Sequence, residues 1–308
     1  MTDQELPTAA AGDAARQLGR LGVFVGSSGK AGPSGLVDLA HRLEGFGYGT
    51  LWLPESVATD PFVLAAFVLA RTERITVATG IANIYARDAL TMRAVRETLG
   101  EAAQGRFLLG LGVSHAPMVT GLRKHEYGKP IETMKSYLEA MAAATYVGPT
   151  PAERAPIVLA ALRPKMLALS RDAARGAHPY FVPPEHTARA REILGKGAWL
   201  CPEQMVLLER DATKARAIAR QNIGIYIGLP NYRNNLKWLG FADADFENGG
   251  SDRLVDAIVA WGDEKVIGDR IQAHLDAGAD HVCIQSFPSD GGRGFDRRVL
   301  EAFAPARQ

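Results

Sequence analysis

The sequence predicts an α/β protein folded as a (β/α)8 barrel of the TIM type, and two observations carry this prediction. Short apolar strand patterns alternate with helical patterns from residue 20 onward, and eight such units fit into the 308 residues. Strict alternation indicates parallel strands joined by right-handed crossovers, and eight units suit a closed barrel. In addition, the segment after the first strand, GSSGKAGPSG at 26–35, lacks the GxGxxG spacing of an open dinucleotide-binding sheet.

The strands are predicted from short apolar runs, several of them β-branched and followed by glycine or polar residues. In chain order they cover residues 20–26, 50–55, 74–83, 106–112, 155–162, 177–182, 198–208 and 280–287.

The helices are predicted from apolar residues at helical spacing and from their end signals. Residues 33–47 repeat apolar positions every three to four residues and stop at Gly47, while Asp60 and Pro61 form a typical helix start. The helices that follow the strands cover 33–47, 60–72, 88–103, 130–146, 164–174, 185–194, 266–278 and 296–304.

One region does not follow this alternation of strands and helices. Residues 209–265 lie between the seventh strand and its helix, and they contain helical patterns at 211–228 and 252–261. An insertion of this length at a barrel mouth is typical of a functional lid. We therefore expect a flexible N-terminal tail over 1–19 and a single barrel domain over 20–308 that includes the insertion.

Composition argues against several classes of partner. The net charge of +1 and the 22% of charged residues do not predict binding to nucleic acid or to an anionic membrane. The chain has no apolar run of the ~18 residues that a membrane helix needs, and no secretory signal pattern. Cys201 and Cys283 lie far apart in apolar runs, which predicts buried free thiols. A cytoplasmic location is the resulting expectation.

Candidate site residues follow from the barrel, because active sites of this fold lie at the carboxyl ends of the strands. The polar or glycine-rich strand ends here are Glu55, Ser56, Gly80 to Asn83, Ser114, His115, Arg163, His178 and Glu203.

The segment RFLLGLGVSHAP at 106–117 admits two other interpretations. Gly112 to Ala116 could form the turn of a serine hydrolase, but such a nucleophile needs a helix directly after it, and Pro117 and Gly121 interrupt the following segment. The seven histidines are scattered without HxxxH spacing or a thiolate partner, so no metal site is predicted.

At these residues the sequence resembles the bacterial-luciferase-like superfamily, and within it the branch that uses the deazaflavin coenzyme F420. The resemblance is carried by GFGYGTLWLPES, RITVATGIAN, RFLLGLGVSH and PIVLAALRPKMLALSRDAARGAH in this order, and it spans roughly residues 20–305.

This resemblance implies that the cofactor ring lies against the end of the third strand, at Gly80, Ile81 and Ala82, with a cis peptide bond between Gly80 and Ile81. It also implies that Glu55 and Ser56 face the ring, with Ser56 in place of a histidine common in relatives. The glycines of the fourth strand are expected to let the backbone approach the ring.

Further contacts are implied at neighbouring strand ends. Ser114 is expected at the ring edge and His115 as a proton donor or acceptor, since histidine titrates near neutral pH. The cofactor phosphate is expected at the backbone of Ala161, Leu162 and Arg163 before a helix. His178 and Arg293 complete the expected cofactor contacts, Arg293 toward phosphate or the oligoglutamate tail.

The predicted function is an oxidoreductase that transfers hydride between coenzyme F420 and a small organic substrate, as a homodimer. Two alternatives stay open: an FMN-dependent monooxygenase of the same superfamily, and a non-catalytic flavin-binding barrel.

Overall fold

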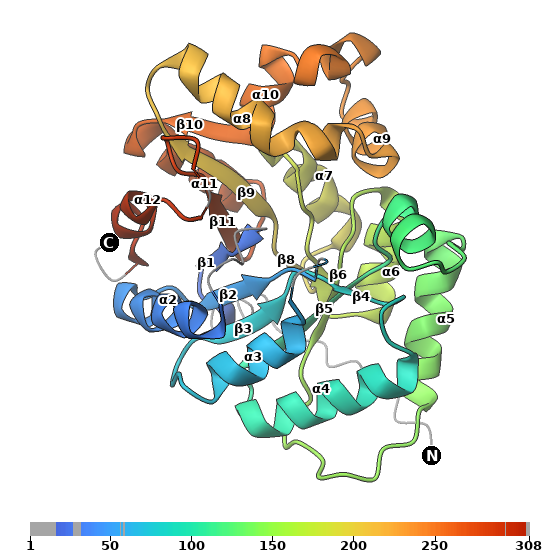
Figure 1. The fold of residues 1–308 in the computed structure, drawn as a ribbon. Helices are drawn as coiled ribbons and strands as arrows, with labels where there is room; N and C mark the ends of the chain where they lie inside the picture. The colour runs from blue at the N-terminus through green and yellow to red at the C-terminus, as the bar shows by residue number, and fades with distance from the viewer. Residues whose placement is uncertain (1–16, 27–31, 56, 58, 293, 306–308) are drawn as a thin grey trace.

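The structure is a computed structural model, and it describes residues 17–26, 32–55, 57, 59–292 and 294–305. Eleven strands form one sheet in which every pair is parallel, in the order β10-β9-β11-β1-β2-β3-β5-β6-β7-β8, with β4 beside β5 (Figure 1). The strands are β1(Leu21–Phe24), β2(Thr50–Leu53), β3(Thr76–Thr79), β4(Ala82–Asn83), β5(Phe107–Gly112), β6(Ile157–Leu159), β7(Gly176–Ala177), β8(Trp199–Leu200), β9(Glu203–Leu208), β10(Val259–Gly262) and β11(Val282–Ser286).

The helices surround this sheet and bury one apolar face against it (Figure 1). They are α2(Pro33–Phe46), α3(Pro61–Leu69), α4(Ala89–Ala103), α5(Pro130–Ala143), α6(Pro164–Ala173), α7(Pro184–Leu194), α8(Ala212–Ile227), α9(Pro230–Trp238), α10(Asp252–Ile258), α11(Glu264–Asp276) and α12(Arg297–Ala302). A π-helical turn, η2(Pro117–Leu122), and a 3₁₀ segment, η3(Asp243–Gly249), complete the order. The predicted alternation and the fold class are confirmed.

The sheet closes through the predicted seventh strand, which is interrupted at Cys201 and Pro202 between β8 and β9. On one side the N–H of Cys201 donates to the carbonyl of Ala177 at 2.9 Å, next to β7. On the other side the N–H of Cys283 in β11 donates to the carbonyl of Pro202 at 3.0 Å. Because β11 also pairs with β1, the eight predicted strands form a ring.

The prediction of a helix over 252–261 is wrong at its end. Helix α10 stops at Ile258, and Val259 to Gly262 instead form β10, which pairs in parallel with Met205–Leu208 of β9. A short apolar run cannot be assigned to helix or strand by periodicity alone, and the free edge of β9 decides the outcome here.

The predicted tail over 1–19 is also shorter than expected at its C-terminal end. The side chain of Leu18 is fully buried in the barrel interior, and its carbonyl accepts a hydrogen bond from Thr50 Oγ1 at 2.6 Å. Residues 1–16 of the predicted tail lie outside the described residues.

The insertion between β9 and α11 contains α8, α9, η3 and α10, which gather on one side of the molecule, at the top of Figure 1. Tyr226 of α8 and Tyr232 of α9 pack on Phe181, which follows β7, with ring centroids 5.4 and 5.2 Å apart. The insertion therefore shares a second core with the strand ends on this side of the barrel. No helix in the described ranges is long and apolar enough to cross a membrane.

Candidate functional site

The third barrel strand is broken where the cofactor ring is expected. The peptide bond between Gly80 and Ile81 is cis, which confirms the expectation drawn from the resemblance. The break interrupts the pairing with β5, and the Thr79 hydroxyl bridges it by contacting the Gly110 carbonyl at 2.8 Å and the Gly110 N–H at 2.9 Å. The backbone groups that the break removes from the ladder are thus satisfied by one side chain.

The glycines of RFLLGLGVSHAP make room for this break. A Cβ atom at Gly110 would lie 1.9 Å from the Thr79 carbonyl oxygen, and one at Gly112 would lie 2.5 Å from the side chain of Ile81. Gly110 requires glycine because the backbone of the neighbouring third strand fills the Cβ position, whereas the contact at Gly112 is with the end of the Ile81 side chain. The expected approach of this backbone to a ring stays a prediction, since in the structure the two glycines contact Thr79 and Ile81.

Glu55 holds this bulge in place from the second strand. Its carboxylate accepts the N–H of Asn83 at 2.8 Å, and its own N–H donates to the Ile81 carbonyl at 3.3 Å. The side chain is only 6% exposed. Its catalytic role stays a prediction, while its contacts are those of a group that positions Ile81 and Ala82.

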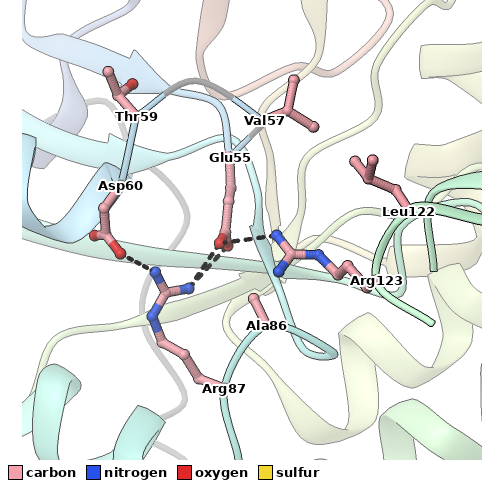
Figure 2. A pocket seen from close by; sticks show the side chains of 8 residues that line it. All are labelled: Glu55, Val57, Thr59, Asp60, Ala86, Arg87, Leu122 and Arg123. Carbon is pink, nitrogen blue, oxygen red and sulfur yellow. Dashed lines mark hydrogen bonds and ion pairs between the residues drawn. The ribbon is translucent and has the colours of Figure 1, made fainter. Parts of the chain in front are cut away.

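Two arginines, neither of them predicted from the sequence, share the Glu55 carboxylate. Nη1 of Arg87 lies 2.9 and 3.0 Å from the two carboxylate oxygens, and Nη2 of Arg123 lies 3.5 Å from one of them. Arg87 also pairs with Asp60, the N-cap of α3. Figure 2 shows Glu55 between the two guanidinium groups.

These groups form the floor of a pocket of about 480 Å³, and Val57 and Leu122 lie at its sides (Figure 2). The sequence offered a weak signal for Arg87, which follows the third strand by a few residues. It offered none for Arg123, because residues 55, 87 and 123 are distant in the chain and meet only through the pairing of β2, β3 and β5.

His115 lies between the fourth strand and the insertion. Its ring is hydrogen-bonded by the Asn231 side chain and lies 5.5 Å from the ring of Tyr232, both from α9. Burial lowers the pKa of His115 below its ordinary value, and the hydrogen bond to Asn231 offsets this in part. Its Nδ1 is buried without a hydrogen-bond partner among the described residues.

Ser114 orients this segment by its backbone. It adopts φ of +57°, a left-handed conformation that is uncommon for a residue other than glycine. The Tyr127 hydroxyl donates to its carbonyl at 3.3 Å. The ring-edge contact of the serine side chain stays a prediction.

The loop after the fifth strand leads directly into α6, as expected for a phosphate site. Ala161 is buried, Arg163 is the N-cap residue, and no side chain caps the N–H groups that open the helix. The side chain of His186, which the sequence did not single out, contacts the Leu162 carbonyl through Nε2 at 2.6 Å. Binding of phosphate at residues 161–163 stays a prediction.

His178 lies inside the barrel, deeper than a rim residue. It is 1% exposed, stacks on Trp52 with ring centroids 4.2 Å apart, and its Nδ1 lies 2.7 Å from the Cys201 carbonyl. Its Nε2 has no partner among the described residues and would lie 3.2 Å from a Cβ on Gly80. His178 therefore supports the bulge from below, and its burial lowers its pKa to about 4.

Glu203 is the second buried carboxyl group of the site and faces the aromatic residues of the insertion. Its Oε2 accepts the N–H of Phe181 at 3.3 Å, and its Oε1 has no partner within the described ranges. Burial raises its pKa to about 8. Its burial therefore favours the protonated carboxyl group, and Tyr180, Tyr226 and Tyr232 lie in its electrostatic surroundings.

Two predicted site residues, Ser56 and Arg293, lie outside the described residues. Within the described part of the chain, no group of three or more His, Cys, Asp or Glu side chains could hold a metal ion.

Comparisons with known proteins identify the family and the fold. A family model described as luciferase-like monooxygenase matches residues 18–281. A protein of Mycobacterium tuberculosis named as a candidate coenzyme F420-dependent oxidoreductase is 24% identical over 251 residues, covering 68% of this chain and 72% of that protein.

Two solved structures illustrate the shared fold. An F420-dependent secondary alcohol dehydrogenase, in complex with an F420–acetone adduct, matches with a TM-score of 0.72 and 13% identity, covering 92% of this chain and 97% of that one. The oxygenating component of 3,6-diketocamphane monooxygenase from Pseudomonas putida, in complex with FMN, matches with a TM-score of 0.63 and 14% identity, covering 93% and 97%. The family model spans most of the chain and the fold is the same, so this protein belongs to the luciferase-like monooxygenase family.

Proposed function

We propose that this protein is an oxidoreductase that binds coenzyme F420 at the carboxyl end of the barrel and transfers hydride between it and a small organic substrate. The observation that carries the proposal is the bulge at Gly80–Ile81, backed by His178 and clamped by Glu55. The Mycobacterium tuberculosis relative and the alcohol dehydrogenase structure support the choice of cofactor.

The residues present fit such a cofactor. Two polar atoms near the mouth are buried without partners among the described residues: His115 Nδ1 and Glu203 Oε1. A buried polar atom without a partner is costly, and a bound polar ring system would satisfy it. The uncapped start of α6 after Arg163 would receive a phosphate group.

When bound, the deazaflavin would supply the hydride chemistry. The chain itself would orient the ring on residues 80–82 and handle the proton. Because burial keeps His115 neutral at pH 7, its unpartnered Nδ1 could accept the proton of a substrate hydroxyl, and the protonated ring could return it in the reverse direction. The insertion over 209–265 would act as a lid that keeps water out.

Titration of the purified protein with F420 and with FMN tests the proposal. We expect F420 to bind at least about tenfold more tightly, a difference of ~1.4 kcal/mol. Tighter binding of FMN would overturn the proposal in favour of the alternative, an FMN-dependent monooxygenase, which the FMN-bound structure of the same fold supports. Binding of either cofactor without turnover of any substrate would point to a non-catalytic barrel.

Two further expectations from the sequence remain predictions: that the protein is cytoplasmic and that it forms a homodimer. Light scattering after size-exclusion chromatography measures the second directly.

A further inference from the structure

The pocket beside the bulge contains one arginine whose hydrogen-bonding capacity is largely unused. Arg123 follows η2, its side chain is 29% exposed, and its Nη2 lies 3.5 Å from Glu55 Oε1. A charge-assisted hydrogen bond is shorter, at roughly 2.7–2.9 Å. Within the described part of the chain, the Arg123 guanidinium donates no hydrogen bond, although it carries five N–H groups.

Arg87, on the opposite side of Glu55, differs from Arg123 because both of its terminal nitrogens have hydrogen-bond partners. Its two terminal nitrogens contact both oxygens of Glu55 and the carboxylate of Asp60, and its side chain is 15% exposed. Of the two cations in Figure 2, Arg123 is therefore the one with donors available to a ligand.

Glu55 does not depend on Arg123 for its own partners. If Arg123 turned to a ligand, the Glu55 carboxylate would keep the N–H of Asn83 and the two contacts from Arg87. A ligand anion could thus pair with Arg123 without leaving a buried carboxylate unpaired, which is the costly outcome.

Two exposed aliphatic side chains line the pocket, beside Thr59 and the charged groups. Val57 is 72% exposed and Leu122 is 56% exposed, and Figure 2 shows both beside the charged floor. Exposed aliphatic side chains next to a cation favour a ligand that combines an apolar body with an anionic group. The pocket has a volume of about 480 Å³ and is open to solvent.

The pocket is also connected to the predicted proton-transfer residue. The turn that carries Leu122 and Arg123 starts from His115, whose carbonyl accepts the N–H groups of Met118 at 2.9 Å and Val119 at 3.0 Å. A ligand held by Arg123 would therefore rest on the segment that positions His115.

We propose that this pocket binds the substrate and that the substrate is an organic acid, its carboxylate paired with Arg123 and its apolar part against Val57 and Leu122. This inference rests on the proposed function and specifies the substrate class of the same site.

Hexanoate and its neutral counterpart hexanamide serve as probes in calorimetric titrations of the full-length protein at low salt. We expect hexanoate to bind at least about tenfold more tightly than hexanamide, as expected for a hydrogen-bonded charge pair. Arg123→Gln should abolish this difference. The matched control is Lys124→Gln, which removes the neighbouring exposed cation and should change hexanoate binding less than about twofold.

Three outcomes would overturn the proposal: equal binding of the two probes, no binding of either probe, or equal weakening of hexanoate binding by Arg123→Gln and Lys124→Gln. If Arg123→Gln does not fold, Arg123→Lys takes its place, with preference for hexanoate reduced but retained.

A last arm repeats the hexanoate titration in the presence of F420. We expect both to bind together. Mutual exclusion would assign Arg123 to the anionic part of the cofactor and would overturn the substrate assignment. Failure of F420 to bind, with hexanoate binding intact, would instead contradict the proposed cofactor and leave the acid-binding pocket standing.

Discussion

Glu203 and His115 both interact with Tyr232, and burial shifts their pKa values in opposite directions. The ring of His115 lies 5.5 Å from that of Tyr232, and Glu203 interacts with the same tyrosine electrostatically. Desolvation disfavours the charged form of each group, so the pKa of the carboxyl rises to about 8 and that of the imidazole falls. Both groups are therefore neutral at pH 7.

The protonation state of Glu203 predicts the direction in which the unfolding free energy changes with pH. Its folded pKa of about 8 lies above the ordinary 4.5, so the stability it contributes is complete below pH 4.5 and is lost as the pH rises toward 8. The full loss is roughly 5 kcal/mol at most. Glu203→Gln keeps the shape without the ionisation, so its unfolding free energy should decline less between pH 5 and 8 than that of the wild type.

Urea unfolding at several pH values measures this difference, and infrared spectroscopy of the folded protein should show a protonated carboxyl band at pH 7 that is absent in Glu203→Gln. If the two proteins share one pH profile, Glu203 is ionised in the fold.

His115→Ala should separate catalysis from binding. We expect kcat to fall by about 10²-fold because proton transfer is lost, while F420 binding changes less than about twofold. The pH profile of kcat/KM should show an apparent pKa below 6.5 in the wild type and not in the variant. His125→Ala, at an exposed position ten residues further along the chain, is the control, and similar losses in both variants would contradict the role of His115.

At the scale of elements, the close approach of the neighbouring strands β3 and β5 explains Gly110 in RFLLGLGVSHAP. Gly110→Ala would place a methyl group 1.9 Å from the Thr79 carbonyl oxygen, so either the bulge or β5 has to move. We expect a loss of about 3 kcal/mol in unfolding free energy and loss of F420 binding.

Gly45→Ala provides the matched control, because a Cβ there meets nothing within 4 Å and the residue lies in α2. It should stabilise the protein by about 0.5–1 kcal/mol and leave cofactor binding unchanged. F420 binding to Gly110→Ala at wild-type strength would show that the ring does not depend on the bulge.

The elements that sequence patterns placed correctly are those that bury one face against the barrel. The strands at 50–55 and 106–112 and the helix at 33–47 have unambiguous periodicity, and the structure contains β2, β5 and α2 there. The elements that the patterns missed depend on partners: β10 forms on the free edge of β9, and η2 follows His115 in a segment without a clear period.

At the scale of the whole molecule, four buried histidines make the stability of the barrel depend on pH. Their rings hydrogen-bond to groups from other segments, and burial lowers their pKa values to about 3 for His274 and about 4 for His178, His186 and His281. The unfolded chain takes up protons near pH 6.5 and the folded chain does not, so their stabilising contribution is complete above that pH.

This stability should be lost as the pH falls from about 6.5 to 4, by up to ~1.4 kcal/mol per histidine and pH unit. Glu203 changes the unfolding free energy in the opposite direction over this pH range. It is one titrating group, however, and the buried histidines are four. Urea unfolding at pH 7, 6 and 5 should show the decline, and His186→Gln should reduce its slope whereas His41→Gln, at an exposed position, should not. A flat profile between pH 7 and 5 would contradict the neutral state of these rings.

The sequence by itself determined the ring of eight parallel strands and the insertion before the last strand, because both follow from local periodicity. The position of the cis bond came from the family resemblance, which rests on motifs in a fixed order. Only the tertiary structure decided how Glu55, Arg87 and Arg123 combine into one pocket and why Gly110 is glycine. These features depend on contacts between residues that are distant in the chain, and such contacts exist only once β2, β3 and β5 have paired.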